Sequence, residues 1–335
     1  MIVFTLIIPV YNVEKYIIDC LKSLTNQKYT KEKYEIIIIN DKSNDQSLKK
    51  IKKFKNKLNN LLIINNKKKS GTGQSRNKGI KAAKGRYLLF IDGDDILYKN
   101  SLNIIEKLIR NKDYDFIGYN FNKILPKNKI AKLCRKDFKF IKQNKKTRIK
   151  NFLKGEIDGS VIFTVFNKKF IEKNKIFFHS NVHEDIFYIF RTYFFSAKFI
   201  LINKALYLKR SRKGSITNTL YQNRISGLFN QILHIKKFLI KHKENFSYFS
   251  KSFVIGFVGY AGYLLTTNYK LNNSKIKNLN YKLIYNYLKK NIYYIKRRNQ
   301  SKKDKIVNLF IECMKKKDIF KNQIKIYEKK VINLL

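Results

Sequence analysis

Three carboxylates occur within four positions of the segment FIDGDD, directly after a run of apolar residues. Asp92, Asp94 and Asp95 are hard oxygen ligands, and two of them suit a Mg²⁺ or Mn²⁺ ion that keeps its other positions for water and phosphates. Asp92 and Asp94 would point to the same side of an extended chain. Because Asp-Gly is also common in turns, the segment alone indicates either a metal site or a plain turn.

A glycine-rich turn precedes that segment and opens an amphipathic helix. Gly71 and Gly73 form the turn, and Arg76 and Asn77 lie on the first turns of the helix. The N-terminus of such a helix attracts anions. The turn is not a Walker loop, which needs Gly-Lys-Ser/Thr. It is not the dinucleotide-binding pattern either, because Gly79 follows Gly73 by six residues instead of three.

A second acidic pair, Glu184 and Asp185, lies in the segment HED at the predicted start of a helix that runs to about Ser196. The helix dipole favours ionised carboxylates there, and an ionised carboxylate can accept a proton from a hydroxyl group. Either acid could instead cap the helix. Adjacent residues at a helix start point in different directions, so both remain candidates for a catalytic base.

Alternating strands and helices must position these residues. Strand-like apolar runs cover 4–10, 34–40, 61–65 and 87–92. Amphipathic helical stripes between them predict a parallel sheet that is covered on both faces. Ligands bind at the carboxyl ends of such strands, where Asp41, Asp92 and the turn PVYN fall. Ser43 and Gln46 have capping-box spacing, which predicts a helix start just beyond Asp41.

The pattern of strand-like and helical segments changes along the chain. From about Asp115 it loosens into strand-like pieces and the helix at Glu184, and from about Tyr221 every segment reads as a lysine-rich helix. We therefore expect an α/β catalytic domain followed by a helical region. The longest apolar run, 253–266, is shorter than the roughly 20 residues of a membrane-spanning helix, and predicts a buried or interfacial helix.

The charge of the chain is strongly positive, with a formal net charge of +50, but it does not decide the function. Lysines are spread along the chain, and Arg supplies only about eleven of the 73 basic residues, so a general lysine background competes with a surface selected for phosphates or anionic lipid. A basic nucleic-acid-binding protein is one alternative. It leaves FIDGDD unexplained, because carboxylates without a metal repel phosphates.

The expected compartment is reducing. The three cysteines lie far apart with no C-x-x-C pair, and the first residues, MIVFTLIIPVYN, enter a strand without the features of a signal peptide. We expect a cytoplasmic protein, at most peripheral on the inner face of the cytoplasmic membrane.

In this order and at these spacings, the segments resemble glycosyltransferase family 2, whose GT-A fold enzymes use nucleotide-activated sugars. The matching stretches are IIPVYNVEKYIIDCLKSL, EIIIINDKSND, GTGQSRNKGIKAAKGRYLLFIDGDD, HEDIFYIFR and YLKRSRKGSIT. The resemblance implies a Rossmann-like, mostly parallel sheet flanked by helices in a catalytic domain over 1–220. Within that domain, residues 1–115 would bind the nucleotide sugar, and residues 116–220 would bind the acceptor and supply the base. The resemblance fades from Tyr221 onward, and there the apolar helical stripes and dense lysines of residues 221–335 predict a helical, basic region for membrane-surface contact, packing or oligomerisation, including packing as a homo-oligomer.

The resemblance also implies roles for single residues. Those implied to bind the donor nucleotide are Pro9, Tyr11, Asn12, Glu14, Asp41, Arg76, Asp92, Gly93 and Arg210. Among them, Asp41 would hydrogen-bond the base and Arg76 would lie near the diphosphate. Asp94 would be the principal metal ligand of a D-x-D motif, with Asp92 beside it. Asp185 would be the catalytic base, with Glu184 as its rival.

The expected reaction is transfer of a hexose or N-acetylhexosamine from a UDP-sugar to a hydroxyl of a glycan or lipid-linked acceptor, with inversion and with Mn²⁺ or Mg²⁺. Such reactions build bacterial surface polysaccharide, capsule or lipooligosaccharide. The processive members of the family carry Gln-x-x-Arg-Trp and several membrane spans, and this chain has no Trp, so we expect a non-processive enzyme. We expect no nucleic acid among its partners. A sugar-nucleotide pyrophosphorylase is a second alternative. It would need a glycine-rich basic loop where this chain has PVYNVEKY.

Overall fold

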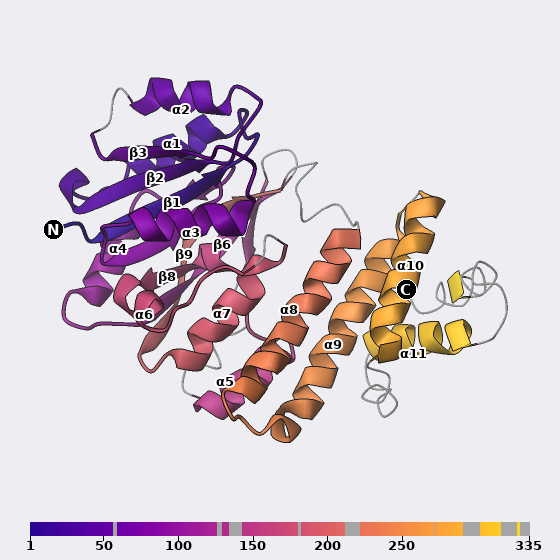
Figure 1. Ribbon diagram of the computed structural model, residues 1–335. Helices are drawn as coiled ribbons and strands as arrows, with labels where there is room; N and C mark the ends of the chain where they lie inside the picture. Colours follow the sequence, from indigo (N-terminus) through magenta and orange to yellow (C-terminus); the bar gives the residue numbers. More distant parts are fainter. Residues whose placement is uncertain are drawn as a thin grey trace. The chain divides into compact units, whose positions relative to one another are not determined.

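The structure, a computed structural model, describes residues 1–55, 59–125, 129–133, 143–179, 182–211, 222–271, 273–290, 302–315 and 327–328. It contains two compact units. One consists of residues 1–143 and 158–213, and the other of residues 144–157 and 214–335. The predicted domain boundary at residue 220 lies outside the described residues, so that division stays a prediction. The first unit is α/β and the second is helical (Figure 1).

The first half of the sheet in the α/β unit is parallel, in the order β3-β2-β1-β4. Its strands are β1 (Phe4–Val10), β2 (Tyr34–Asn40), β3 (Leu61–Asn65) and β4 (Tyr87–Phe90). The sequence prediction of the first three strands is confirmed in type and bounds. The central strands carry isoleucine-rich runs because both of their faces are buried. β4 ends before the acids, because the chain turns there.

The second half of the sheet is mixed, which the apolar pattern alone did not predict. Here β8 (Thr164–Asn167) runs antiparallel to both β4 and β6 (Phe116–Ile124). β9 (Phe199–Arg210) is parallel to β6. The two-residue strand β5 (Ile96–Leu97) pairs antiparallel with β9, and β7 (Ile130–Leu133) with β6. The chain between β4 and β5 therefore lies beside the end of β9.

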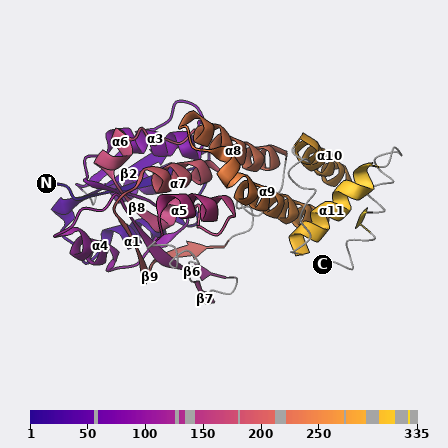
Figure 2. The same cartoon turned by 90° about the horizontal axis from the view of Figure 1, so that it is seen from below.

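Helices cover both faces of this sheet, with α3 and α6 on one side and α1 and α4 on the other (Figure 2). The helices of this unit are α1 (Ile17–Thr25), η1 (Lys31–Lys33), α2 (Ser47–Lys55), α3 (Thr72–Ala82), α4 (Ser101–Ile109), η4 (Val161–Phe163), α6 (Lys168–Lys173) and α7 (Glu184–Phe195). Close packing of α3 on β1 requires Gly79, since a Cβ there would lie 2.3 Å from Cγ2 of Ile7. The predicted helix at Glu184 is confirmed.

The predicted capping box at Ser43 is wrong. The helix after β2 begins at Ser47, not just beyond Asp41. The Ser43 hydroxyl accepts a hydrogen bond from the backbone N–H of Asn12, in the neighbouring loop, so it does not cap a helix. The first N–H of α2, at Ser47, donates to Oδ1 of Asp45. A contact between two loops has overridden a local signal.

The second unit contains α5 (Lys145–Leu153), α8 (Gln222–Lys241), α9 (Phe246–Tyr269), α10 (Ser274–Lys290) and α11 (Lys302–Lys315). The end of α5 packs against α9 at Gly256, where a Cβ would lie 1.7 Å from the carbonyl oxygen of Leu153. The apolar run 253–266 lies within α9, and several of its side chains are buried in this unit. In the described part of the chain, no helix combines the length and the apolar character needed to cross a bilayer.

Candidate active site

The three acids that follow β4 lie in a tight turn. The backbone N–H of Asp95 donates to the carbonyl oxygen of Asp92 across 3.0 Å. The turn, rather than an extended chain, gathers the carboxylates: one oxygen of each of Asp92, Asp94 and Asp95 lies within 4.8 Å of the others. At Gly93 a Cβ would lie only 3.2 Å from Cγ2 of Val13, so the turn packs closely on the loop after β1.

Asp95 differs from the other two acids because it is buried, with 2% of its surface exposed. Its Oδ2 accepts a hydrogen bond from the Tyr207 hydroxyl at 2.8 Å, and its Oδ1 accepts one from the backbone N–H of Arg210 at 2.7 Å. Burial, together with the charges of Asp92 and Asp94, raises the pKa of Asp95 well above its ordinary value. Asp92 and Asp94 are partly exposed, and they are the better candidates for metal ligands.

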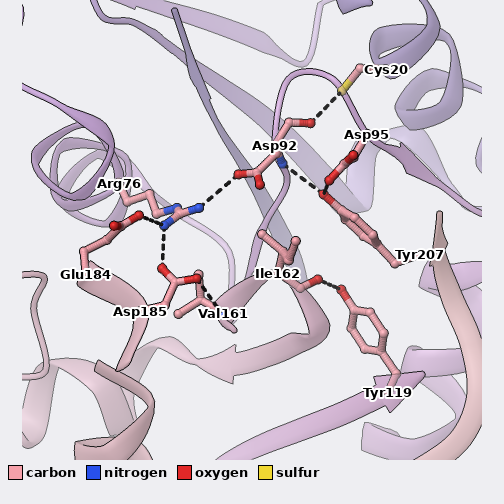
Figure 3. A network of polar contacts seen from close by, with 10 residues as sticks. All are labelled: Cys20, Arg76, Asp92, Asp95, Tyr119, Val161, Ile162, Glu184, Asp185 and Tyr207. Atoms are coloured by element: carbon pink, nitrogen blue, oxygen red, sulfur yellow. Dashed lines mark hydrogen bonds and ion pairs between the residues drawn. The ribbon is translucent and has the colours of Figure 1, made fainter. Parts of the chain in front are cut away.

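Arg76, on α3, joins the acid turn, which is the turn of Asp92, Asp94 and Asp95, to the acidic pair Glu184 and Asp185 (Figure 3). One guanidinium nitrogen, Nη1, lies 2.7 Å from Oε1 of Glu184 and 2.7 Å from Oδ1 of Asp185, and Nη2 lies 3.0 Å from Oδ1 of Asp92. Only 2% of Arg76 is exposed. Burial opposes its charge, but the three carboxylates outweigh burial and raise the pKa of Arg76. A single buried cation therefore holds carboxylates from both candidate sites.

Glu184 and Asp185 begin α7, directly after His183, which has a left-handed backbone. Their side chains are 13% and 23% exposed. Oδ2 of Asp185 also accepts a hydrogen bond from the N–H of Val161 at 3.3 Å. Burial and the neighbouring Asp185 raise the pKa of Glu184 to about 8, and burial raises the pKa of Asp185 against the opposing charge of Arg76. Raised pKa values suit a base that works near neutral pH.

Two members of the turn after β1, Asn12 and Glu14, bind the loop after β2. The N–H of Asn44 donates to Oδ1 of Asn12 at 3.0 Å, and the N–H of Gln46 donates to Oε2 of Glu14 at 2.8 Å. In return, the N–H of Glu14 donates to Oδ2 of Asp45 at 3.0 Å. These reciprocal bonds fix the two loops to each other. The structure thus gives both side chains a positioning role, and their predicted contact with a nucleotide stays a prediction.

Tyr11 in the same turn is 40% exposed, next to the half-buried Pro9 that lies near the end of β1. The ammonium of Lys69 lies 3.7 Å from the centre of the Tyr11 ring, which is a cation–π contact. An exposed aromatic face at the carboxyl edge of a sheet offers a surface on which a flat base can stack. Lys69 had no signal in the sequence, because it is one of many lysines.

Asp41, at the end of β2, is 3% exposed and holds the glycine-rich turn. Its carboxylate accepts hydrogen bonds from the N–H groups of Ser70 and Gly71, the hydroxyl of Ser70 and the amide of Asn66, at 2.7–3.0 Å. Burial opposes these bonds, but together they lower the pKa of Asp41. Three of these donors meet Oδ1, and the N–H of Gly71 meets Oδ2. The predicted bond from Asp41 to a base stays a prediction.

Arg210 ends β9 beside the acid turn. Its Nε donates to the carbonyl oxygen of Asp94 at 3.1 Å, and its guanidinium lies 5.1 Å from the ring centre of Tyr16. The predicted site residues thus form two groups. One contains Arg76, Asp92, Asp94, Glu184, Asp185 and Arg210. The other, at the ends of β1 and β2, contains Pro9, Tyr11, Asn12, Glu14 and Asp41, and Gly93 packs between the acid turn and the loop after β1.

Sequence reasoning missed two contributors to the first group: the bond of the Tyr207 hydroxyl to the acid turn and the backbone N–H of Val161 on Asp185. Tyr207 begins the matching stretch YLKRSRKGSIT, but the sequence does not show its partner. That partner is 112 residues away in the chain, so only the pairing of β5 with β9 reveals it.

Comparison with known proteins gives one family. The model of the family described as "Glycosyl transferase family 2" matches residues 5–174. Glycosyltransferase GlyG of Streptococcus pneumoniae is 29% identical over 223 residues, which are 64% of this chain and 73% of GlyG. A poly(ribitol-phosphate) beta-glucosyltransferase of Bacillus spizizenii is 46% identical over 99 residues, 29% of this chain and only 16% of that longer protein.

Among solved structures, residues 1–349 of TarS from Staphylococcus aureus, in complex with UDP-GlcNAc, match with a TM-score of 0.66 and 21% identity. The match covers 86% of this chain and 81% of that one. This likeness shows the fold, and it confirms the predicted class of a sheet flanked by helices with a helical C-terminal region.

Proposed function

Because the chain belongs to glycosyl transferase family 2 and is therefore a glycosyltransferase, we propose that it moves a sugar from a UDP-sugar to a hydroxyl of a glycan or lipid-linked acceptor. The transfer inverts the anomeric carbon and is non-processive. The observation that carries this proposal is the polar cluster of Figure 3, in which Arg76 joins an acid turn to the acidic pair Glu184 and Asp185.

The named relatives support the donor and the kind of product. The solved TarS complex contains UDP-GlcNAc, and the Bacillus relative is named a glucosyltransferase that acts on poly(ribitol phosphate). We therefore propose a UDP-linked hexose or N-acetylhexosamine as donor and a bacterial surface glycan as product. The ring face of Tyr11 would stack on the base, while Asp41 would hold the glycine-rich turn in place beside it.

Asp94 and Asp92 are proposed to hold a divalent cation, Mn²⁺ or Mg²⁺. The fit rests on the chemistry of the cluster: carboxylate oxygens from three neighbouring acids lie within 4.8 Å of one another, and hard cations prefer such ligands. When bound, the cation would offset negative charge on the leaving diphosphate. The nearby guanidinium of Arg210 adds a positive charge at the same edge of the sheet.

Asp185 is the proposed base. The acceptor oxygen attacks the anomeric carbon, the bond from that carbon to the diphosphate breaks, and the hydroxyl proton passes to a carboxylate oxygen. Arg76 and the N–H of Val161 hold Asp185 in one orientation, and its side chain is more exposed than that of Glu184. In a turnover assay, Asp185→Asn should therefore lose far more activity than Glu184→Gln. The reverse order would assign the base to Glu184.

The donor site can be tested without knowing the sugar. UDP, GDP and CDP are titrated calorimetrically with and without Mn²⁺, on the wild type and on Asp94→Asn. We expect Mn²⁺-dependent binding of UDP that Asp94→Asn abolishes. If no nucleotide binds under any condition while DNA binds tightly and in a salt-sensitive manner, the chain is a nucleic-acid-binding protein and the proposal fails.

We also propose that the helical unit contacts an anionic membrane surface that carries the acceptor. On α10, Ile276 and Leu279 are three residues apart on one face and are 42% and 44% exposed. The exposed Lys275 and Lys282 flank them, and apolar side chains beside lysines are typical of interfacial helices. Liposome flotation tests this: the protein should float with anionic vesicles at low salt, and Ile276→Asp with Leu279→Asp should abolish it. No flotation of the wild type would refute this contact.

A further inference from the structure

The acid turn is fastened to the end of β9 by four hydrogen bonds. The N–H of Asp92 donates to the Tyr207 hydroxyl at 3.1 Å, and that hydroxyl donates to Asp95. The backbone N–H of Arg210 donates to the other oxygen of Asp95, and Nε of Arg210 donates to the carbonyl oxygen of Asp94. Every residue of the turn that carries a carboxylate is thus bonded to β9.

The Tyr207 hydroxyl makes two of these four bonds, and Figure 3 shows both. It bridges the first and last acids of the turn by accepting from one and donating to the other. Its ring is completely buried, and its backbone is opposite Leu97 in the β5–β9 pair, two residues after Asp95. A rigid aromatic side chain on a paired strand therefore sets the position of the hydroxyl before any ligand arrives.

This arrangement gives Asp95 a different role from that of Asp92 and Asp94. Both of its oxygens already accept hydrogen bonds from β9, and it is almost fully buried. Ionised carboxylates in such a short turn repel one another, and the two donors on Asp95 offset part of that repulsion. The two donors that Asp95 receives from β9, a hydroxyl and a backbone N–H, are both neutral.

We infer that Tyr207 is a positioning residue that sets the geometry of Asp92 and Asp94 for a divalent cation, and that Asp95 is its anchor and not a third ligand. This inference rests on the proposed function, because it assumes that Asp92 and Asp94 bind the cation. Partners that orient ligating carboxylates typically change metal affinity by roughly 10- to 100-fold when they are removed.

The chain offers a matched control for the loss of one buried hydroxyl. Tyr119, on the adjacent strand β6, is also fully buried, and its hydroxyl donates to the carbonyl oxygen of Ile162 at 2.7 Å. Tyr119→Phe and Tyr207→Phe therefore make the same chemical change in the same sheet. Tyr119→Phe should lower the melting temperature by about 2–4 °C, and Tyr207→Phe should lower it more, because it leaves both the N–H of Asp92 and the buried carboxylate of Asp95 without the hydroxyl. Only Tyr207→Phe removes a bond to the acid turn.

The experiment measures Mn²⁺ affinity by the loss of the free-ion electron paramagnetic resonance signal, at saturating UDP. We expect Tyr207→Phe to weaken Mn²⁺ binding by roughly 10- to 100-fold. Tyr119→Phe should stay within about twofold of the wild type, because it does not touch the site. High Mn²⁺ should restore UDP binding to Tyr207→Phe. Asp95→Asn, which keeps the shape of the anchor, should weaken Mn²⁺ binding less than Asp94→Asn does.

Three results would overturn the inference. Equal Mn²⁺ affinity in the two tyrosine variants would show that the hydroxyl does not position the ligands. If Asp95→Asn lost Mn²⁺ as completely as Asp94→Asn, Asp95 would be a ligand. If the wild type bound neither Mn²⁺ nor UDP, the proposed function itself would fail, and the inference with it. Should Tyr207→Phe fail to fold, the comparison of Asp95→Asn with Asp94→Asn still decides between anchor and ligand.

Discussion

Replacing Arg76 with methionine tests whether one buried cation holds the candidate site together. The Arg76 side chain is 3% exposed, and its guanidinium faces Asp92, Glu184 and Asp185 at 2.7–3.0 Å. Methionine keeps much of the length of the side chain but leaves three partly buried carboxylates without their cation. Removing one partner of a buried ion pair costs about 3–5 kcal/mol. At roughly 2–4 °C per kcal/mol for a unit of this size, the melting temperature should fall by about 6–20 °C.

The loss of stability caused by Arg76→Met should also depend on pH. Burial holds the pKa values of Glu184 and Asp185 above their ordinary range, so the folded protein binds more protons than the unfolded chain between the ordinary and the raised values. Stability therefore falls as pH rises across that window. Without Arg76 both pKa values rise further and the window extends upward. The gap between wild type and Arg76→Met should consequently be wider at about pH 9 than at about pH 6.

Thermal denaturation at both pH values is the assay, with Arg86→Met as the matched control. Arg86 pairs with Asp113 at the surface, where the two side chains are 39% and 68% exposed. An exposed pair contributes at most about 1 kcal/mol, so the control should lose no more than a few degrees at either pH. If Arg76→Met melted like Arg86→Met at both pH values, the three carboxylates would not depend on Arg76, and the account of this cluster would be wrong.

Three further predictions concern the base, the glycine-rich turn and the helical unit. The value of kcat/KM should fall as pH decreases through the pKa of the base, which burial raises above the ordinary value of an aspartate; a fall centred on that ordinary value would contradict this. Asp41→Asn should lower stability by about 1.5–3 kcal/mol in denaturant titrations, because four donors lose a charged acceptor. Gly256→Ala should lower the melting temperature, since its Cβ would strike the Leu153 carbonyl, whereas Gly259→Ala, with open space, should not.

The local structure of the α/β unit could be predicted from the sequence. Apolar runs predicted the bounds of β1, β2 and β3; in β1 and β2 the runs are continuous because strands that are buried on both faces need continuous apolar residues. Gly71 and Gly73 marked the start of α3, and the pair at Glu184 marked the start of α7. The acids of FIDGDD were recognised as a candidate metal site by their type and spacing alone. These features depend on neighbours within a few positions.

The tertiary structure alone decided which of these residues meet. Arg76 reaches Glu184 and Asp185 across 108 and 109 positions of the chain, because β8 pairs with β4 and brings the following segment to the same edge of the sheet. The side chains of Asn12 and Glu14 hold two loops together, because the N–H groups that donate to them belong to the chain after β2. The Asp95 carboxylate is bonded to β9, because β9 pairs with β5, the strand that directly follows Asp95. Periodicity in a sequence reports which face of an element is buried, but the partner of a polar side chain depends on how the sheet orders its strands.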